Sequence, residues 1–396
     1  MQAIPPTAGR AALLVAAITL SSDAAAAQAL RERLSSLMTT QGQGPAGQGP
    51  DTVAAGRSRD ALVGLLGAEL AMMPLSTAPS GFVYELNPTL GLVERASDTF
   101  GAFFTERALR IGEGQASFGF AYQAASFSTL QGADLREGSF EINATRAEGA
   151  IQPYAVDTLG LALETRTLTA RAVYGVTDSL DVLAVVPFVH ARFDGTRVSS
   201  DDGVPVLDIQ TAGSASGLGD AGLGARFRVA GRGGRGVAIG SDLRLPTGRA
   251  SDLLGTGKLA LRGQAIATWD QGPVAASANA GLGVGGVSSE FFWNTAVTVA
   301  VAQRVTVVGE VFGRRLGELH RLDQVYAPHS ELAGVEVMRL VADETSAVAI
   351  GYAVAGVKWN VTGSLLVGAS MLMRFTDAGL RARVTPSLTV DYDFTP

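Results

Sequence analysis

The feature that most constrains the fold is a strict alternation of apolar and polar residues near the end of the chain. From Leu380 to Phe394 the even-numbered positions are Leu, Ala, Val, Pro, Leu, Val, Tyr and Phe, and the odd-numbered positions are Arg, Arg, Thr, Ser, Thr, Asp and Asp. Successive side chains of a β-strand point to opposite faces, so this segment would have one apolar and one polar face. It is also longer than the strands of about 5–6 residues that are typical of soluble proteins.

Further segments with a period of two precede it. The full set of predicted strands is 115–127, 160–176, 179–194, 218–230, 235–246, 257–270, 273–286, 291–302, 304–316, 346–358, 363–375 and 380–394. Bacterial single-chain outer-membrane barrels have an even number of antiparallel strands. We therefore predict an all-β fold, a transmembrane antiparallel β-barrel of about 12 strands with a small N-terminal periplasmic or plug segment. Segment 160–176 is longer than a span needs, so we expect part of it to project above the membrane.

The composition excludes several other classes. The mean hydropathy is +0.23 and only 17% of residues are charged, yet the chain has no apolar run of about 18 residues, which excludes helical membrane spans. The absence of Cys excludes disulfides, thiolate metal sites and cysteine nucleophiles. The net charge of −6 argues against a nucleic-acid partner.

The connections between the predicted strands alternate in length. Those at 177–178, 231–234, 271–272, 359–362 and around Gln303 are tight, whereas 128–159, 195–217, 247–256 and 317–345 are long; 287–290 and 376–379 are short exceptions on the outer side. Outer-membrane barrels have short periplasmic turns and longer outer loops. The pattern predicts the outer membrane as location, with both ends of the barrel chain in the periplasm. A soluble sandwich with one wet face would explain the alternation but not this asymmetry.

The N-terminal third has a different organisation. Residues 1–27 resemble a signal peptide, with an apolar run at 11–20 and small residues before a cut that we place after Ala27. Residues 41–50 read as a Gly/Gln/Pro linker, 60–75 as a short helix, and 81–95 as a hairpin with a turn at Asn87. We divide the chain into a signal peptide (1–27), a linker, helix and possible plug segment (28–112), and a barrel (113–396).

Several stretches resemble the family of outer-membrane channels named for the MetA pathway of phenol degradation. They are FFTERALRIG at 103–112, VYGVTDSLDVLAVVPF at 173–188, GLGDAGLGAR at 217–226 and LPTGRASDLLGTG at 245–257. The resemblance covers roughly 82–394 and rests on the order of short, mostly Gly-rich motifs. It implies a barrel in the outer membrane and the passage of small compounds, with aromatic ones as candidates, and it implies no catalytic residues. One departure is that Thr395 and Pro396 follow the C-terminal aromatic residues that the barrel-assembly machinery reads.

Motifs that could carry other chemistry have simpler explanations. GLGDAG at 217–222 matches a dinucleotide fingerprint, but a strand follows it where a helix is required. The stretch GTGK at 255–258 lacks the remainder of a phosphate loop. His190, His320 and His329 have no metal-ligand spacing. Outer-membrane hydrolases of the phospholipase type have a Ser two residues after the His, and Arg192 stands there. We predict no cofactor, no metal ion and no enzymatic activity.

The polar strand faces predict the lining of the lumen. An Arg on the lipid face would cost about 2–4 kcal/mol at the bilayer midplane, so the ionisable residues should point inward. They are Arg171, His190, Arg192, Arg226, Arg228, Asp242, Arg244, Lys258, Arg262, Glu310, Arg314, Arg374, Arg381, Arg383 and Asp391.

Such a lining has two interpretations. It forms a wet channel for small solutes, with anionic ones as candidates, or it is filled by internal Arg–carboxylate pairs together with the N-terminal segment. The sequence therefore predicts a channel or diffusion-type transporter, with a structural or surface-interaction barrel with a blocked lumen as the alternative and a hydrolase as a more distant one. The expected partners are outer-membrane lipid, a small-molecule solute and the barrel-assembly machinery.

Overall fold

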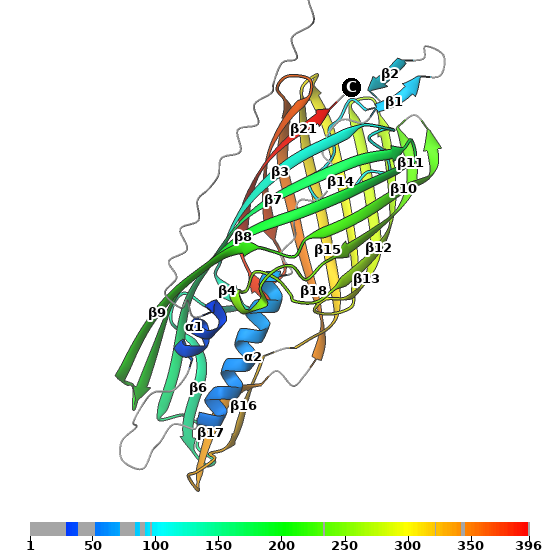
Figure 1. Cartoon of the computed structure of the whole chain (residues 1–396). Helices are drawn as coiled ribbons and strands as arrows, with labels where there is room; N and C mark the ends of the chain where they lie inside the picture. Colours follow the sequence, from blue (N-terminus) through cyan, green and yellow to red (C-terminus); the bar gives the residue numbers. More distant parts are fainter. Residues whose placement is uncertain are drawn as a thin grey trace, which may run out of the picture.

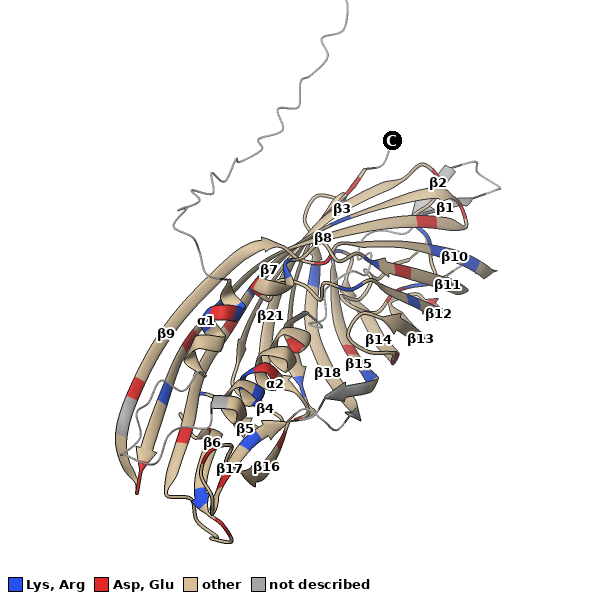
Figure 2. Cartoon of the chain, turned by 60° about the horizontal axis from the view of Figure 1, so that its bottom comes forward, with Lys and Arg blue, Asp and Glu red and all other residues tan. Residues whose placement is uncertain are grey.

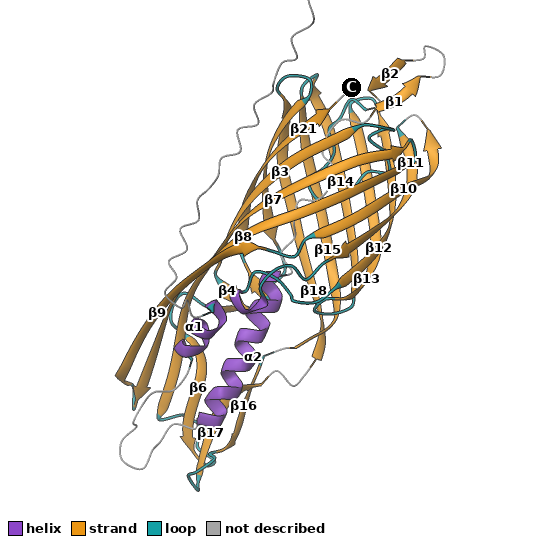
Figure 3. Cartoon of the chain, in the orientation of Figure 1, coloured by secondary structure: helices purple, strands orange, loops and turns teal. Residues whose placement is uncertain are grey.

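The computed structural model describes residues 29–38, 52–71, 84–87, 92–95, 97–232, 234–320, 322–341 and 345–394. The predicted signal peptide and the 41–50 linker lie outside these residues. Within the described residues, twelve antiparallel strands close into a barrel (Figures 1 and 3). The prediction of an all-β, twelve-strand barrel is confirmed.

The barrel follows the order of the chain. Its strands are β3 (Ala116–Phe127), β7 (Ala155–Thr177), β8 (Leu180–Asp201), β10 (Gly222–Arg232), β11 (Arg235–Arg244), β12 (Ala260–Gln271), β13 (Val274–Gly285), β14 (Glu290–Ala302), β15 (Val305–His320), β18 (Thr345–Asn360), β19 (Leu365–Arg374) and β21 (Val384–Phe394). The last strand closes on the first, with Tyr392 opposite Phe118. Because β3 begins and β21 ends at the edge that carries the tight turns, we call this edge the inner end and the opposite edge the outer end.

The alternation that predicted β21 is visible in its exposure. Val384, Leu388 and Tyr392 on its even face are exposed, whereas the odd face, including Asp391, is buried. Trp269, Trp293 and Trp359 also point outward, each near the end of its strand, which is where aromatic girdles lie in membrane barrels. The barrel is therefore apolar outside and polar inside.

Three of the predicted long loops, 128–159, 195–217 and 317–345, contain strands. We call the sheet that projects beyond the outer end the outer sheet; its strands are, in order, β16 (Asp323–Pro328), β17 (Val335–Val341), β6 (Phe140–Ala147), the outer parts of β7 and β8, and β9 (Val204–Leu218). The sequence prediction ended β8 at residue 194, but it continues to Asp201. The boundary was wrong because the outward face becomes polar here: Phe188 is exposed on that face, and Arg192 and Asp194 follow it there, while Phe193 on the inward face stays buried. Alternation with lipid-facing apolar residues stops where the strand leaves the bilayer.

Smaller elements complete the outer end. β4 (Thr129–Leu130), β5 (Ala133–Asp134) and β20 (Leu380–Arg381) form a three-stranded sheet, and a short 3-10 helix, η1 (Ala250–Asp252), lies in the loop between β11 and β12. Before the barrel strands in the sequence, β1 (Tyr84–Asn87) and β2 (Leu92–Arg95) pair as a hairpin, within the range 81–95 where one was predicted.

Two helices lie against the outer sheet (Figure 2). They are α1 (Leu30–Leu37), which packs against β8 and β9, and α2 (Thr52–Ala71), which packs against β17 and β6. Both therefore lie at the outer end, beyond the lumen segment and the tight turns. In the described part of the chain, neither helix is long and apolar enough to span a membrane.

Residues 97–111, which we call the lumen segment, follow the β1–β2 hairpin. All of these residues except Asp98 are buried. Ser97 donates a hydrogen bond of 2.5 Å to Asp270 on β12, and the backbone N–H of Phe100 donates one of 3.2 Å to Thr306 on β15. The segment thus lies inside the barrel, in the half nearest the inner end.

Candidate functional site: the barrel lumen

Ten of the fifteen residues predicted to line the lumen lie on inward faces of barrel strands. They are Arg171, Arg226, Arg228, Asp242, Arg244, Arg262, Glu310, Arg314, Arg374 and Asp391. Most of them alternate with outward-facing apolar neighbours, which is the pattern that the prediction used, although the exposed Arg315 follows Arg314. Most of them contact another part of the chain rather than open space.

Two predicted lining residues lie on the opposite face. His190 and Arg192 share their face of β8 with the exposed Val186 and Phe188, so they point outward, contrary to the prediction. They are polar because β8 has left the apolar belt at this height and its outward face meets water. The prediction assumed that every polar residue on a strand faces the lumen, which holds only within the bilayer.

His190 contacts a hydroxyl on the neighbouring strand. Its Nδ1 lies 2.7 Å from Oγ of Ser216 on β9. A catalytic Ser–His pair also requires a group that orients the second ring nitrogen and donors for an oxyanion. Since the described contacts of His190 supply neither, we read the pair as a cross-strand polar contact on the outer sheet.

Three further residues were also placed wrongly. Lys258 and Arg383 are exposed outside the strands, and Arg381 lies on the short β20, where it pairs with Asp377 of the same loop. The barrel strand begins at Val384 and not at residue 380. Apolar–polar alternation continues through 380–383 by coincidence, because Leu380 there packs into the interior of the outer end.

The lumen segment is bound chiefly by one carboxylate, that of Glu310 on β15. This carboxylate accepts hydrogen bonds from the backbone N–H groups of Phe103 at 2.6 Å, Phe104 at 3.0 Å and Thr105 at 2.9 Å, and from the Thr105 hydroxyl at 2.9 Å. Hydrogen bonds to a charged acceptor contribute more than neutral ones. Glu310 therefore holds the apex of the segment in the lumen.

A second anchor is a three-membered charge cluster. Arg226 on β10 pairs with Glu106 of the lumen segment and, at 2.8 Å, with Asp242 on the neighbouring strand β11. The side chain of Arg226 is almost completely buried. A buried cation of this kind is tolerated only when paired, so the segment supplies a charge that the barrel wall needs.

Other wall residues bind the same segment. Arg110 lies 3.4 Å from Asp181 near the start of β8. Lys358 on β18 donates a hydrogen bond of 2.9 Å to the carbonyl of Ala102, and its ammonium lies 4.4 Å from the centre of the Phe103 ring. The segment is thus held on several sides of the barrel.

Sequence reasoning missed the residues of the lumen segment. Glu106 and Arg110 occur in the stretch FFTERALRIG, which has neither strand nor helix periodicity. One signal could have identified them. A segment that has ionisable residues but no periodicity comes directly before a barrel whose strands carry many inward-facing ionisable residues. Their individual partners are not readable from the sequence.

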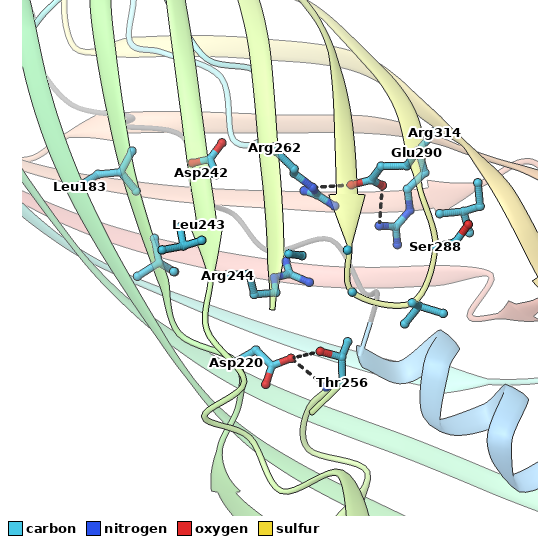
Figure 4. A pocket seen from close by; sticks show the side chains of 17 residues that line it. Leu183, Asp220, Asp242, Leu243, Arg244, Thr256, Arg262, Ser288, Glu290 and Arg314 are labelled. Atoms are coloured by element: carbon cyan, nitrogen blue, oxygen red, sulfur yellow. Dashed lines mark hydrogen bonds and ion pairs between the residues drawn. The ribbon is translucent and has the colours of Figure 1, made fainter. Parts of the chain in front are cut away.

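Above the lumen segment, towards the outer end, lies a small cavity of about 110 Å³ (Figure 4). We call it the outer cavity. Arg244, Arg262 and Arg314 converge on it from β11, β12 and β15, and Glu290 on β14 pairs with Arg262 and lies 3.6 Å from Arg314. Its wall also contains apolar side chains, among them Leu183. The cavity could hold a small solute with a polar or anionic group.

The C-terminal end of α2 lies close to this cavity, as Figure 4 shows. Glu69, near that end, is buried against Gly379 in the β19–β21 connection, and a Cβ at Gly379 would overlap its carboxylate. Burial raises the pKa of the Glu69 carboxyl above its ordinary value, although Arg374 and Arg314 oppose the shift. The last turn of α2 therefore places an ionisable group, Glu69, at the outer end of the lumen.

The acidic residues of the lumen are its candidate metal ligands within the part of the chain that the structure describes. Among the residues that the structure describes, no group of three or more His, Asp or Glu side chains is placed to hold a metal ion. The acidic side chains of the lumen are engaged with arginines, backbone N–H groups or hydroxyls, as in the case of Asp220, which accepts bonds from Gly248 and Thr256.

No protein-family model matches the chain, and no curated protein matches it. Among solved structures, it is similar to the COG4313 outer membrane channel from Pseudomonas putida F1, with 14% identity and a TM-score of 0.46 over 72% of this chain and 97% of that one. It is also similar to the NanC porin, with 6% identity and a TM-score of 0.34 over 65% and 100%. The toluene transporter TbuX from Ralstonia pickettii has 11% identity and a TM-score of 0.30 over 72% and 90%. These levels of similarity do not transfer a function to this chain.

Proposed function

We propose that this protein is an outer-membrane channel for small molecules whose lumen is closed in the resting state by the lumen segment, residues 97–111. The observation that carries the proposal is the character of the contacts between this segment and the wall. A closed barrel with an apolar exterior and a polar interior suits a water-filled pore. The segment that occupies this interior is held by side-chain hydrogen bonds and ion pairs, centred on Glu310.

Such contacts are exchangeable. The described residues 97–111 form no strand with the wall, so the segment can leave without breaking the barrel ladder. Water can replace each polar contact that is lost, which keeps the net contribution of a single hydrogen bond small. A plug bound in this way can move between a closed and an open arrangement of the same barrel.

The outer cavity supports a class of solute. Arg244, Arg262 and Arg314 would attract a carboxylate or another anionic group, while Leu183 offers an apolar surface. The carboxylates of the lumen reduce this preference, so we propose modest selectivity for small polar or anionic compounds. Aromatic compounds are included because of the resemblance to the MetA phenol-degradation family.

The proposed orientation places the inner end in the periplasm. The tight turns lie at this end, together with the start of β3 and the end of β21. The outer sheet and the longer connections lie at the opposite end, as expected for the side that faces the medium. The protein would then contact lipid through its apolar belt and a solute through its lumen.

The alternative is a barrel whose lumen is permanently blocked. The buried pair of Arg171 and Asp391 and the cluster around Arg226 favour it, because paired charges fill space that a solute would need. The two functions differ in whether the lumen segment can move. They are therefore separable by a measurement of ion flow.

The experiment is single-channel recording in planar bilayers. It compares the full chain with a variant in which residues 97–111 are replaced by a Gly/Ser linker of the same length. A closed or rarely open full chain together with a steadily conducting variant supports a plugged channel. Absence of conductance in both would favour the blocked barrel, and equal steady conductance in both would show that the segment does not close the pore.

A further inference from the structure

The order of elements along the chain differs from their order across the membrane. Helices α1 and α2 come first in the sequence and lie at the outer end, against the outer sheet. The lumen segment comes next and begins near the inner end, where Ser97 contacts Asp270. Strand β3 then starts at that inner end, beside Gly175. The end of α2 at Ala71 and the start of the lumen segment at Ser97 therefore lie toward opposite ends of the barrel.

Helix α1 packs closely against β8 and β9 at the outer end. A Cβ at Gly195 on β8 would overlap Leu37, and a Cβ at Gly213 on β9 would lie 2.9 Å from Leu30, so two glycines make room for its apolar side chains. Arg197, buried on β8, donates a hydrogen bond of 3.5 Å to the carbonyl of Leu37 and so binds the C-terminal turn of α1.

Helix α2 is held at the outer end by a hydrogen bond and by apolar packing. The Ser58 hydroxyl accepts a buried hydrogen bond of 2.8 Å from the backbone N–H of Leu340 on β17. Leu62 and Leu66 of the helix belong to the same buried cluster as Leu161 on β7. Without the two helices, this apolar inner face of the outer sheet would be exposed to water, which is unfavourable.

We infer that the barrel displays its own N-terminal segment at the cell surface, with α1 and α2 outside the membrane as a cap over the outer mouth. The inference goes beyond the proposed channel function. It depends on the proposed orientation and not on whether the lumen conducts.

Surface labelling tests this directly, because the chain has no Cys and each introduced thiol is the only one. Glu32→Cys on α1 and Asp60→Cys on α2 are the test variants, and both positions are exposed. Ile151→Cys, between β6 and β7 and 92% exposed, reports the outer tip. Gln303→Cys, in the exposed β14–β15 turn, reports the inner end. Intact cells are treated with a membrane-impermeant maleimide, and heat-modifiable migration on gels verifies that each variant is folded.

The expected result is labelling of the thiols at positions 32, 60 and 151 in intact cells, and of the thiol at position 303 only after the outer membrane is permeabilised. Labelling of positions 32 and 60 only after permeabilisation would overturn the inference. If position 151 is labelled in that case, the helices do not lie at the surface. If position 303 is labelled instead, the orientation of the barrel is reversed.

Discussion

Replacement of Glu310 should open the lumen more than any other conservative change. Its carboxylate binds three consecutive backbone N–H groups, of residues 103–105, and the Thr105 hydroxyl. Glu310→Gln keeps the shape of the side chain, but it removes the charge and replaces one acceptor oxygen by an amide that faces N–H donors. Because hydrogen bonds to a charged group contribute about 1.5–3 kcal/mol each and do not add fully, we expect the closed state to lose about 2–5 kcal/mol.

This loss converts into a change of open probability. Each 1.4 kcal/mol corresponds to about a tenfold shift between two states, so the ratio of open to closed channels should rise by about 30-fold to a few thousand-fold. Single-channel recordings of the purified full chain measure this ratio as the fraction of time open. The unit conductance should stay similar to that of rare openings of the unchanged protein.

The matched control is Glu290→Gln. It is the same substitution in the same lumen, but the contacts of Glu290 are with Arg262 and Arg314 in the barrel wall. We expect little change in open probability from it. If Glu310→Gln leaves the open fraction unchanged, or if both variants raise it equally, Glu310 is not the group that holds the lumen segment.

The remaining predictions concern stability, pH and the outer face. Asp391→Ala leaves the buried Arg171 without its carboxylate and should destabilise the barrel by about 3–5 kcal/mol, read from the urea midpoint; the loss should be largely recovered when Arg171→Met is added, and no recovery would contradict the pairing argument. Burial raises the pKa of Glu69, so its contribution to the docking of α2 is complete at low pH and is lost as pH rises from about 4.5 through the raised value. Hydrogen exchange in α2, corrected for intrinsic rates, should therefore quicken with rising pH, and Glu69→Gln should abolish that dependence; an unchanged dependence would refute this assignment. His190→Ala should leave the unit conductance unchanged because His190 faces outward, and a changed conductance would return it to the lumen.

The sequence predicted the barrel because each transmembrane strand is a local pattern with two different solvents on its two faces. Strand β21 shows this clearly, since an apolar face towards lipid and a polar face towards the lumen leave an unambiguous period of two. The same reasoning failed above the bilayer. There His190 and Arg192 lie on the outward face, and a polar residue no longer indicates which way a strand faces.

The candidate site was less predictable than the fold. Arg226 could be placed inside the barrel from its strand, but its partner Glu106 lies 120 positions earlier in a non-periodic segment. The role of Glu310 depends on backbone N–H groups, which every residue except proline carries and which leave no mark in the sequence. Contacts of this kind are set by the three-dimensional path of the chain.

The most direct test of the plugged channel is to tether the lumen segment to the wall. A Cβ built on Gly236 of β11 lies 3.4 Å from Cβ of Ala108, close to the separation of about 3.5–4.5 Å found in disulfides. The pair Ala108→Cys and Gly236→Cys, in the Glu310→Gln background, therefore provides a reversible lock in a chain without other thiols. We expect closed channels when the pair is oxidised and frequent openings after reduction on the same bilayer. Equal conductance in the oxidised and reduced states would show that the lumen segment does not close the pore.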